Sequence, residues 1–373
     1  MRTLRWAATL VVGFTVMLSV RGGLAATGAT TTYEVGESSR VFKPGHARNW
    51  RGAKTEALRA TIWYPVNADG KVYEEPQVIG PPDGPLFLAG GAAVDAPIAT
   101  SPAKFPVVML SHGTGGSAMQ LAWLGTVLAR HGYIAVGINH PGNNALEPYT
   151  AEGFVLWWER ATDISDALDA LLSDATFGTH VDEARIGAAG FSIGGYTVLE
   201  LAGARTDQEQ FLKACRTDPT LHKCVVPEMK SMGDPEQMLA KVRASSAESM
   251  VRGGASYRDS RVKAVFAIAP AVGQAFDADG FREVTIPVAM VVGAADQIAP
   301  VATNAGRFLA LMLNAHLTVL PDGVAHYTFL DTCTDVGRAK LGVFCVDAAG
   351  VDREKVHATV SAMAVKFFDK NLK

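Results

Sequence analysis

Apolar segments of two kinds alternate along the chain from Phe105 onward. Short runs such as "FPVVMLSHG" and "YIAVGINHPG" end at glycine or proline and are typical of strands that are buried on both faces. Between them lie segments with helical spacing, such as "SAMQLAWLGTVLARHG" and "WWERATDISDALDALLSD". Strands that alternate with helices predict an α/β fold, with a mostly parallel central sheet and helices on both faces.

The alternation continues toward the C-terminus. Further buried strands are predicted at "ARIGAAG", "RVKAVFAIAP", "PVAMVVGAAD" and "AHLTVLPDG", and helices at "TNAGRFLALML" and "REKVHATVSAMAVKFFDKNL". Two strands, "TYEVGESSRVFKPG" and "EALRATIWYPV", are predicted before this region. The segment from about Asn67 to Lys104 is rich in Pro, Gly and Ala, so we expect a surface loop there.

One segment interrupts the alternation of strands and helices. Residues 205–260 are polar, contain methionines and two cysteines, and include helical stretches such as "PEQMLAKVRASSAESMV". The segment lies between two predicted core elements. We therefore expect a lid inserted at about 205–260, within a single domain that spans residues 27–373.

The N-terminus differs in composition from the rest of the chain. Basic residues precede an apolar run from Trp6 to Val20, and small residues follow between Gly22 and Ala26. This pattern is typical of a secretory signal peptide, which we assign to residues 1–26. The apolar run is shorter than the ~20 residues that span a bilayer, which disfavours the alternative of an uncleaved membrane anchor. We expect a periplasmic or secreted protein without a stable membrane anchor.

The cysteines agree with export. Cys215 and Cys224 form one local pair, and Cys333 and Cys345 form another. Four cysteines allow three connectivities, and we favour these two pairs because short loops close easily. In an oxidising compartment each disulfide would contribute ~2–3 kcal/mol of stability. A zinc site is not predicted, since no CxxC spacing is present.

The charge of the chain disfavours one class of partner. The net charge is −3, and no long basic run is present. Nucleic-acid binding therefore has no electrostatic support.

Ser192 stands between Gly190 and Gly194 at the point where a predicted strand becomes a helix. A Gly-x-Ser-x-Gly sequence in that context is typical of the nucleophile elbow, a tight turn that presents the serine hydroxyl above the carboxyl end of the sheet. The glycines avoid a collision between side chains on either side of the turn. We predict that Ser192 is a catalytic nucleophile; the alternative is a structural serine in a tight turn.

A serine nucleophile needs a base, and His326 is the best candidate. It lies in "PDGVAHYTFLD", directly after the last predicted strand, so we expect it at the same edge of the sheet as the elbow. His112 and His140 also follow strands but precede the serine, and His357 lies within the final helix.

Asp296 is the predicted acid that orients the histidine. It directly follows the strand "VAMVVG", and the chain order Ser, Asp, His is the one that accompanies this elbow. Asp277, Asp279 and Asp322 are the alternatives. Asp296 would otherwise serve as a helix cap or turn residue.

The oxyanion of a tetrahedral intermediate needs two N–H donors. The amide of Ile193, directly after the nucleophile, is one candidate. The other is Thr114, in the glycine-rich sequence "SHGTGG" after the first core strand. His140, Trp157 and Trp158 lie near the same edge of the sheet and are candidates for substrate binding, with packing or turn hydrogen bonds as equal alternatives.

With these motifs the sequence resembles the α/β-hydrolase superfamily, and within it the bacterial group called predicted dienelactone hydrolases, related to platelet-activating-factor acetylhydrolases. The matching pieces span about residues 58–330 and are "ATIWYPV", "FPVVMLSHGTGG", "HGYIAVGINHPGNN", "GAAGFSIGG", "VVGAADQIAP" and "VAHYTF". The resemblance implies the same catalytic residues, the same two oxyanion donors and no cofactor. True dienelactone hydrolases use a cysteine nucleophile where this chain has Ser192, so their substrate does not carry over.

The sequence thus predicts an exported serine hydrolase of the α/β-hydrolase fold that cleaves small carboxylic esters through a Ser-His-Asp triad and an acyl-enzyme, without metal or cofactor. An amidase or peptidase, a cofactor-free perhydrolase with the same triad, and a non-catalytic binding protein of this fold remain alternatives.

Overall fold

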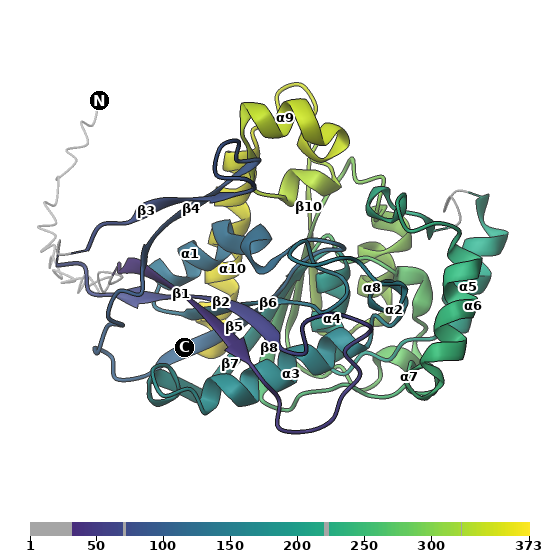
Figure 1. Ribbon diagram of the computed structural model, residues 1–373, viewed down its shortest axis with the longest axis horizontal. Coiled ribbons are helices and arrows are strands. Elements are labelled where there is room, and N and C mark those ends of the chain that lie inside the picture. Colours follow the sequence, from purple (N-terminus) through teal and green to yellow (C-terminus); the bar gives the residue numbers. More distant parts are fainter. Residues whose placement is uncertain (1–31, 70–71, 220–223, 322) are drawn as a thin grey trace, which may run out of the picture. The chain divides into compact units, whose positions relative to one another are not determined.

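A single sheet organises the part of the chain that the computed structural model describes, residues 32–69, 72–219, 224–321 and 323–373 (Figure 1). The predicted signal peptide at residues 1–26 and the alternative acid Asp322 lie outside these ranges. The strands are β1 (Glu34–Phe42), β2 (Leu58–Val66), β3 (Glu75–Ile79), β4 (Phe87–Val94), β5 (Phe105–Ser111), β6 (Ile134–Asn139), β7 (Val181–Phe191), β8 (Val262–Ile268), β9 (Val288–Gly293), β10 (Ala315–Leu320) and β11 (Thr332–Cys333).

The described strands follow the order β10-β9-β8-β7-β5-β6-β2-β1-β4-β11, with β3 paired to β4 off this path. The six strands from β5 to β10 run parallel to one another, whereas β2 is antiparallel to β6 and to β1. The chain places β6 on one side of β5 and β7 on the other. Such a reversal of strand order opens a crevice at the carboxyl ends of the strands, here those of β5 and β7.

Helices cover both faces of the sheet. The helices are α1 (Ala122–Arg130), α2 (Ala151–Val155), α3 (Glu159–Leu172), α4 (Ile193–Leu201), α5 (Gln208–Thr217), α6 (Pro235–Ser245), α7 (Ala247–Val251), α8 (Ala305–Leu311), α9 (Asp335–Leu341) and α10 (Arg353–Leu372). One apolar core joins the sheet to α3, α4 and α8, and a second joins it to α1 and α10. Every residue of β5 and β6 is buried, because these strands have a helical layer on each side.

The segment 67–104 differs from the predicted surface loop. It contains β3 and β4, which pair with each other, and β4 also pairs with β1 and β11. The sequence of β4, "FLAGGAAV", lacks a clear alternation and contains two glycines, so its periodicity did not indicate a strand. Its pairing depends on β1 and β11, which are distant in sequence.

Residues 205–260 contain α5, α6 and α7, which Figure 1 shows at the end of the sheet opposite β3 and β4. α6 begins with Asp234 as its N-cap and Pro235 in its first turn, a combination that favours a helix start. The ion pair Arg216–Glu236 joins the C-terminal end of α5 to the N-terminal end of α6, and Glu209–Arg243 joins the N-terminal end of α5 to the C-terminal end of α6.

The two ends of this inserted segment meet. The Asp259 amide donates to the Leu201 carbonyl oxygen over 3.1 Å, so the chain leaves the core after α4 and returns beside the same point before β8. We refer to residues 205–260 as the lid.

Disulfides join Cys215 to Cys224 and Cys333 to Cys345, the two pairings that the sequence favours. The first lies in the lid, and the second encloses α9. Over the part of the chain that the structure describes, we find no helix with the length and apolar character needed to cross a bilayer.

Candidate active site

Ser192 occupies a strained turn between β7 and α4. Its φ of 57° and ψ of −118° lie outside the regions that side-chain-bearing residues normally adopt. A Cβ atom at Gly190 would lie 2.1 Å from the Gly194 carbonyl oxygen, and one at Gly194 would lie 1.9 Å from the Ser111 carbonyl oxygen. Glycine is therefore required on both sides of the serine. The Ser192 amide donates to the Ile268 carbonyl oxygen in β8 (2.9 Å), which anchors the turn to the sheet.

Ser192, His326 and Asp296 form a hydrogen-bonded series. The Ser192 Oγ lies 2.9 Å from His326 Nε2, and His326 Nδ1 lies 2.7 Å from Asp296 Oδ2. The amides of Ile298 and Ala299 donate to Asp296 Oδ1 over 2.9 and 2.7 Å. Each residue follows the carboxyl end of a strand: β7, β10 and β9. The carboxylate can hold the imidazole with Nδ1 protonated, which leaves Nε2 free to accept the serine proton.

The alternative residues lie elsewhere. Asp277 accepts from the Gly280 amide and Asp279 pairs with Arg282, so neither carboxylate contacts His326. His357 stacks on Trp123 in the core between α10 and α1, at a ring-centroid distance of 4.4 Å.

A cavity of about 450 Å³ opens from the serine toward the lid. Ser192, Ile193 and Thr114 line it at one end. Within the described residues, neither the Thr114 nor the Ile193 amide donates a hydrogen bond to a protein acceptor. Two free backbone donors from residues that line the same cavity as Ser192 are suited to stabilise a negative oxygen.

Aromatic and aliphatic side chains form much of the cavity wall. Trp157 contributes from the segment before α3, and Phe211 from α5 of the lid; their rings meet edge to face at 4.7 Å. Cys215 and Cys224 belong to the same wall. The lid therefore forms part of the cavity wall.

Of the other predicted substrate-binding residues, the structure does not place His140 or Trp158 in the cavity wall. The Trp158 ring packs in an apolar cluster with residues of α6, and its Nε1 donates to Ser249 Oγ (3.1 Å). His140 is fully buried and bonds Ser111 Oγ (2.9 Å) and Asp163 Oδ2 (2.7 Å).

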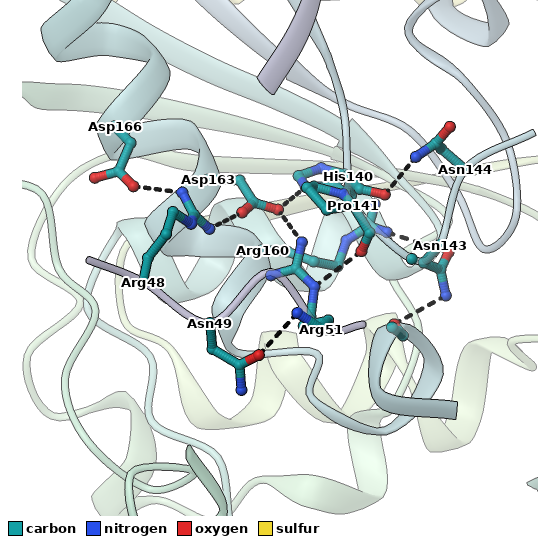
Figure 2. Close-up of polar contacts among 12 residues, drawn as sticks. Arg48, Asn49, Arg51, His140, Pro141, Asn143, Asn144, Arg160, Asp163 and Asp166 are labelled. Carbon is teal, nitrogen blue, oxygen red and sulfur yellow. Dashed lines mark hydrogen bonds and ion pairs between the residues drawn. The ribbon is translucent and has the colours of Figure 1, made fainter. Parts of the chain in front are cut away.

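Figure 2 shows the buried charged cluster that contains His140. Arg48 and Arg51 converge on Asp163 of α3, and Arg48 also pairs with Asp166. Burial alone would raise the pKa of Asp163, but the two arginines outweigh it and hold that pKa below its ordinary value. Burial and the nearby Arg160 lower the pKa of His140 to about 3, so this imidazole is neutral.

Arg160, in the first turn of α3, was not identified from the sequence. Its guanidinium lies between the cluster and the cavity, and burial lowers its pKa to about 9. One signal in the sequence could have identified it: Arg160 and Asp163 lie on a predicted helix whose apolar residues are buried. Charged side chains are rarely buried without a partner, so two of them on such a helix indicate a buried charged cluster. The described residues contain no group of three or more His, Cys, Asp or Glu that could hold a metal ion.

Comparison with protein families gives a match between residues 86–219 and the model of a PET hydrolase-like family. Cutinase est1 of Thermobifida alba is 30% identical over 105 residues, which are 28% of this chain and 32% of the cutinase. Bis(hydroxyethyl) terephthalate hydrolase of Streptomyces coelicolor is 29% identical over 116 residues, 31% of this chain and 34% of the hydrolase. The chain thus spans about a third of the length of the curated relatives that it matches.

Among solved structures, a ferulic acid esterase from Streptomyces cinnamoneus superimposes with a TM-score of 0.58 at 19% identity. The superposition covers 93% of this chain and 92% of the esterase. The predicted fold class is therefore confirmed: helices cover both faces of a mostly parallel sheet, as in this esterase.

Proposed function

We propose that this member of the α/β-hydrolase superfamily is a serine hydrolase that cleaves carboxylic esters. The observation that carries the proposal is the hydrogen-bonded series from Ser192 Oγ through His326 to Asp296. Ser192 lines a cavity together with Thr114 and Ile193, whose amides donate to no acceptor among the described residues. The curated relatives, a cutinase and a bis(hydroxyethyl) terephthalate hydrolase, are both named for ester cleavage.

In the proposed reaction, His326 Nε2 takes the proton of Ser192 as Oγ attacks the ester carbonyl. The amides of Thr114 and Ile193 stabilise the resulting oxyanion. His326 returns the proton to the departing alkoxide, which leaves as an alcohol and gives an acyl-enzyme. Water, deprotonated by the same imidazole, then releases the acid. Asp296 stabilises the protonated imidazole, and the scheme needs no cofactor.

The cavity favours small esters with an apolar group. Its wall includes apolar side chains such as Trp157, Phe211 and Leu239, which suit an aliphatic or aromatic substituent. Ser192 is 7% exposed, which fits a molecule that enters the cavity better than a broad polymer surface.

The disulfides support a location outside the reducing cytosol. We propose that the protein is exported by a signal peptide at residues 1–26. N-terminal sequencing of the exported protein tests this; a retained Met1 would contradict cleavage.

Turnover of short-chain nitrophenyl esters by the native protein and by Ser192→Ala tests the catalytic assignment. We expect the variant to lose turnover and labelling by a fluorophosphonate, while it keeps its melting temperature within a few degrees. An unlabelled native protein would favour a non-catalytic binding function. Matched ester and amide substrates, and peroxide as the acyl acceptor, separate an esterase from an amidase or a perhydrolase.

A further inference from the structure

Arg160 is a buried cation whose hydrogen bonds reach only neutral acceptors within the described chain. Its guanidinium donates to the His112 carbonyl oxygen, to Thr197 Oγ1 (3.2 Å), and more weakly to Ser111 Oγ (3.4 Å) and Asn143 Oδ1 (3.5 Å). Asp163 stabilises the charge of Arg160 electrostatically, but Arg160 makes no hydrogen bond to a carboxylate among the described residues, so its burial costs free energy.

The bonds of Arg160 lie on both sides of Thr114. The His112 carbonyl precedes Thr114 in the chain, and Asn143 Oδ1 also accepts from the Gly115 amide (2.7 Å), directly after it. Figure 2 shows the guanidinium of Arg160 reaching toward Asn143. Arg160 thus contacts the peptide unit before the Thr114 donor directly, and it reaches the peptide unit after this donor through Asn143.

The same guanidinium reaches the second donor through α4. Thr197 Oγ1, which accepts from Arg160 Nε, donates to the Ile193 carbonyl oxygen over 2.9 Å. Ile193 begins α4 and carries the other amide. Arg160 is therefore linked to both segments that supply an oxyanion donor.

The part of α3 that carries Arg160 is held in place by contacts that do not involve the Arg160 side chain. One turn further along α3, Asp163 pairs with Arg51 and is hydrogen-bonded to the neutral His140, and both contacts are independent of Arg48. These contacts connect α3 to the segment before β2 and to the end of β6. The guanidinium accordingly projects from a fixed helix.

From these contacts we propose that Arg160 is a positioning residue that sets the spacing of the Thr114 and Ile193 amides, an inference that rests on the proposed ester hydrolysis. The two donors lie on separate segments, after β5 and after β7, and no covalent link fixes their separation. Donors that are held in place before the reaction need not reorganise when the oxyanion forms. Their contribution to catalysis depends on this prior positioning.

The test compares Arg160→Lys and Arg160→Met with Arg48→Lys. Arg48 belongs to the same buried cluster but contacts neither donor segment. The measurements are kcat and KM for a short-chain nitrophenyl ester, the affinity for a boronic acid that forms a tetrahedral adduct with serine, and the melting temperature.

We expect kcat to fall about tenfold in Arg160→Lys and about a hundredfold in Arg160→Met, by comparison with the loss of one oxyanion donor. KM should stay within threefold, and boronate affinity should fall in parallel with kcat. Arg48→Lys should lower the melting temperature while kcat stays within twofold. Folded Arg160 variants with native kcat and boronate affinity would overturn the proposal, as would an equal loss of kcat in Arg48→Lys.

Thr197→Val provides a second measurement if the Arg160 variants do not fold. It removes the contact between the guanidinium and α4 at nearly constant volume, and should lower kcat about threefold to tenfold with little change in KM. Native kcat in this variant would overturn the proposal. An inactive Ser192→Ala beside fully active Arg160 variants would refute the positioning role alone and leave the proposed function intact.

Discussion

The hydroxyl of Tyr327 donates to the carboxylate of Glu228 over 3.1 Å, and so joins the residue after His326 directly to the lid. Glu228 lies in a short 3₁₀ turn, Pro227–Met229, next to Met229 in the cavity wall. The contact therefore joins a lid segment that lines the cavity to the segment that carries His326.

Tyr327→Phe removes this contact with little change in volume. A hydrogen bond to a carboxylate is worth ~1.5–3 kcal/mol, and part of this would be lost from the contact that holds Glu228 of the lid beside the His326 segment. We therefore expect KM to rise several-fold with a smaller change in kcat. Steady-state kinetics on a short-chain ester check this, with the exposed Tyr73→Phe as the control. An unchanged KM would show that the lid does not depend on the contact.

Asp296→Asn should leave the protein folded and reduce kcat about 10³- to 10⁴-fold, because an amide cannot stabilise the imidazolium or enforce the Nδ1-protonated tautomer. Asp277→Asn changes a carboxylate that bonds only the Gly280 amide among the described residues, and serves as the matched control. Equal losses of kcat in both variants would argue against Asp296 as the orienting acid.

Phe211→Ala should enlarge the cavity on the lid side, since this ring forms the wall with Trp157. We expect the ratio of kcat/KM for long-chain over short-chain nitrophenyl esters to rise about tenfold, the scale on which hydrophobic pockets discriminate. Leu309→Ala, on α8 and outside the cavity wall, is the control. A chain-length profile that is identical in all three proteins would exclude this wall from the substrate site.

Glu200→Gln should change how stability depends on pH. Burial raises the pKa of Glu200 from 4.5 to about 8, although hydrogen bonds from Tyr196 and Thr206 oppose it. Between these pH values the folded protein keeps a proton that the unfolded chain has released. The free energy of unfolding therefore falls as pH rises through this window, at up to ~1.4 kcal/mol per pH unit.

The glutamine variant lacks this proton and keeps an acceptor for the Tyr196 hydroxyl. Its stability relative to the native protein should increase from pH 5 to pH 8. Urea denaturation at several pH values measures the difference, with the exposed Glu183→Gln as the reference. A difference that is constant with pH would contradict the assignment.

Local sequence was sufficient for features that depend on neighbouring residues. The strand before Ser192, the glycines at 190 and 194 and the helix after it define the turn within one short segment. The predicted strands from Phe105 onward match β5 to β10 because buried parallel strands are continuous apolar runs. The same reasoning predicts Asp296 and His326 directly after strand ends. In the structure His326 lies within hydrogen-bonding distance of both Ser192 and Asp296.

Features that depend on contacts between distant residues were not predicted. Arg48 and Asp163 pair across a sequence separation of 115, and neither residue type signals burial by itself. The strand β4 likewise depends on partners in β1 and β11. His140 and Trp158 were expected near the substrate because they lie close to strand or helix ends, but that position does not tell which way a side chain points.

The adjacent ends of the lid, joined by the Asp259 amide and the Leu201 carbonyl, have a further consequence. The lid begins after α4 and ends before β8, at neighbouring points of the core, and it lies between Ser192 and Asp296 in the sequence. The lid could therefore be exchanged for a shorter or differently shaped segment without any change in the pairing of strands in the sheet. Replacing this one contiguous segment would therefore reshape the cavity wall and leave Ser192, Asp296 and His326 in place.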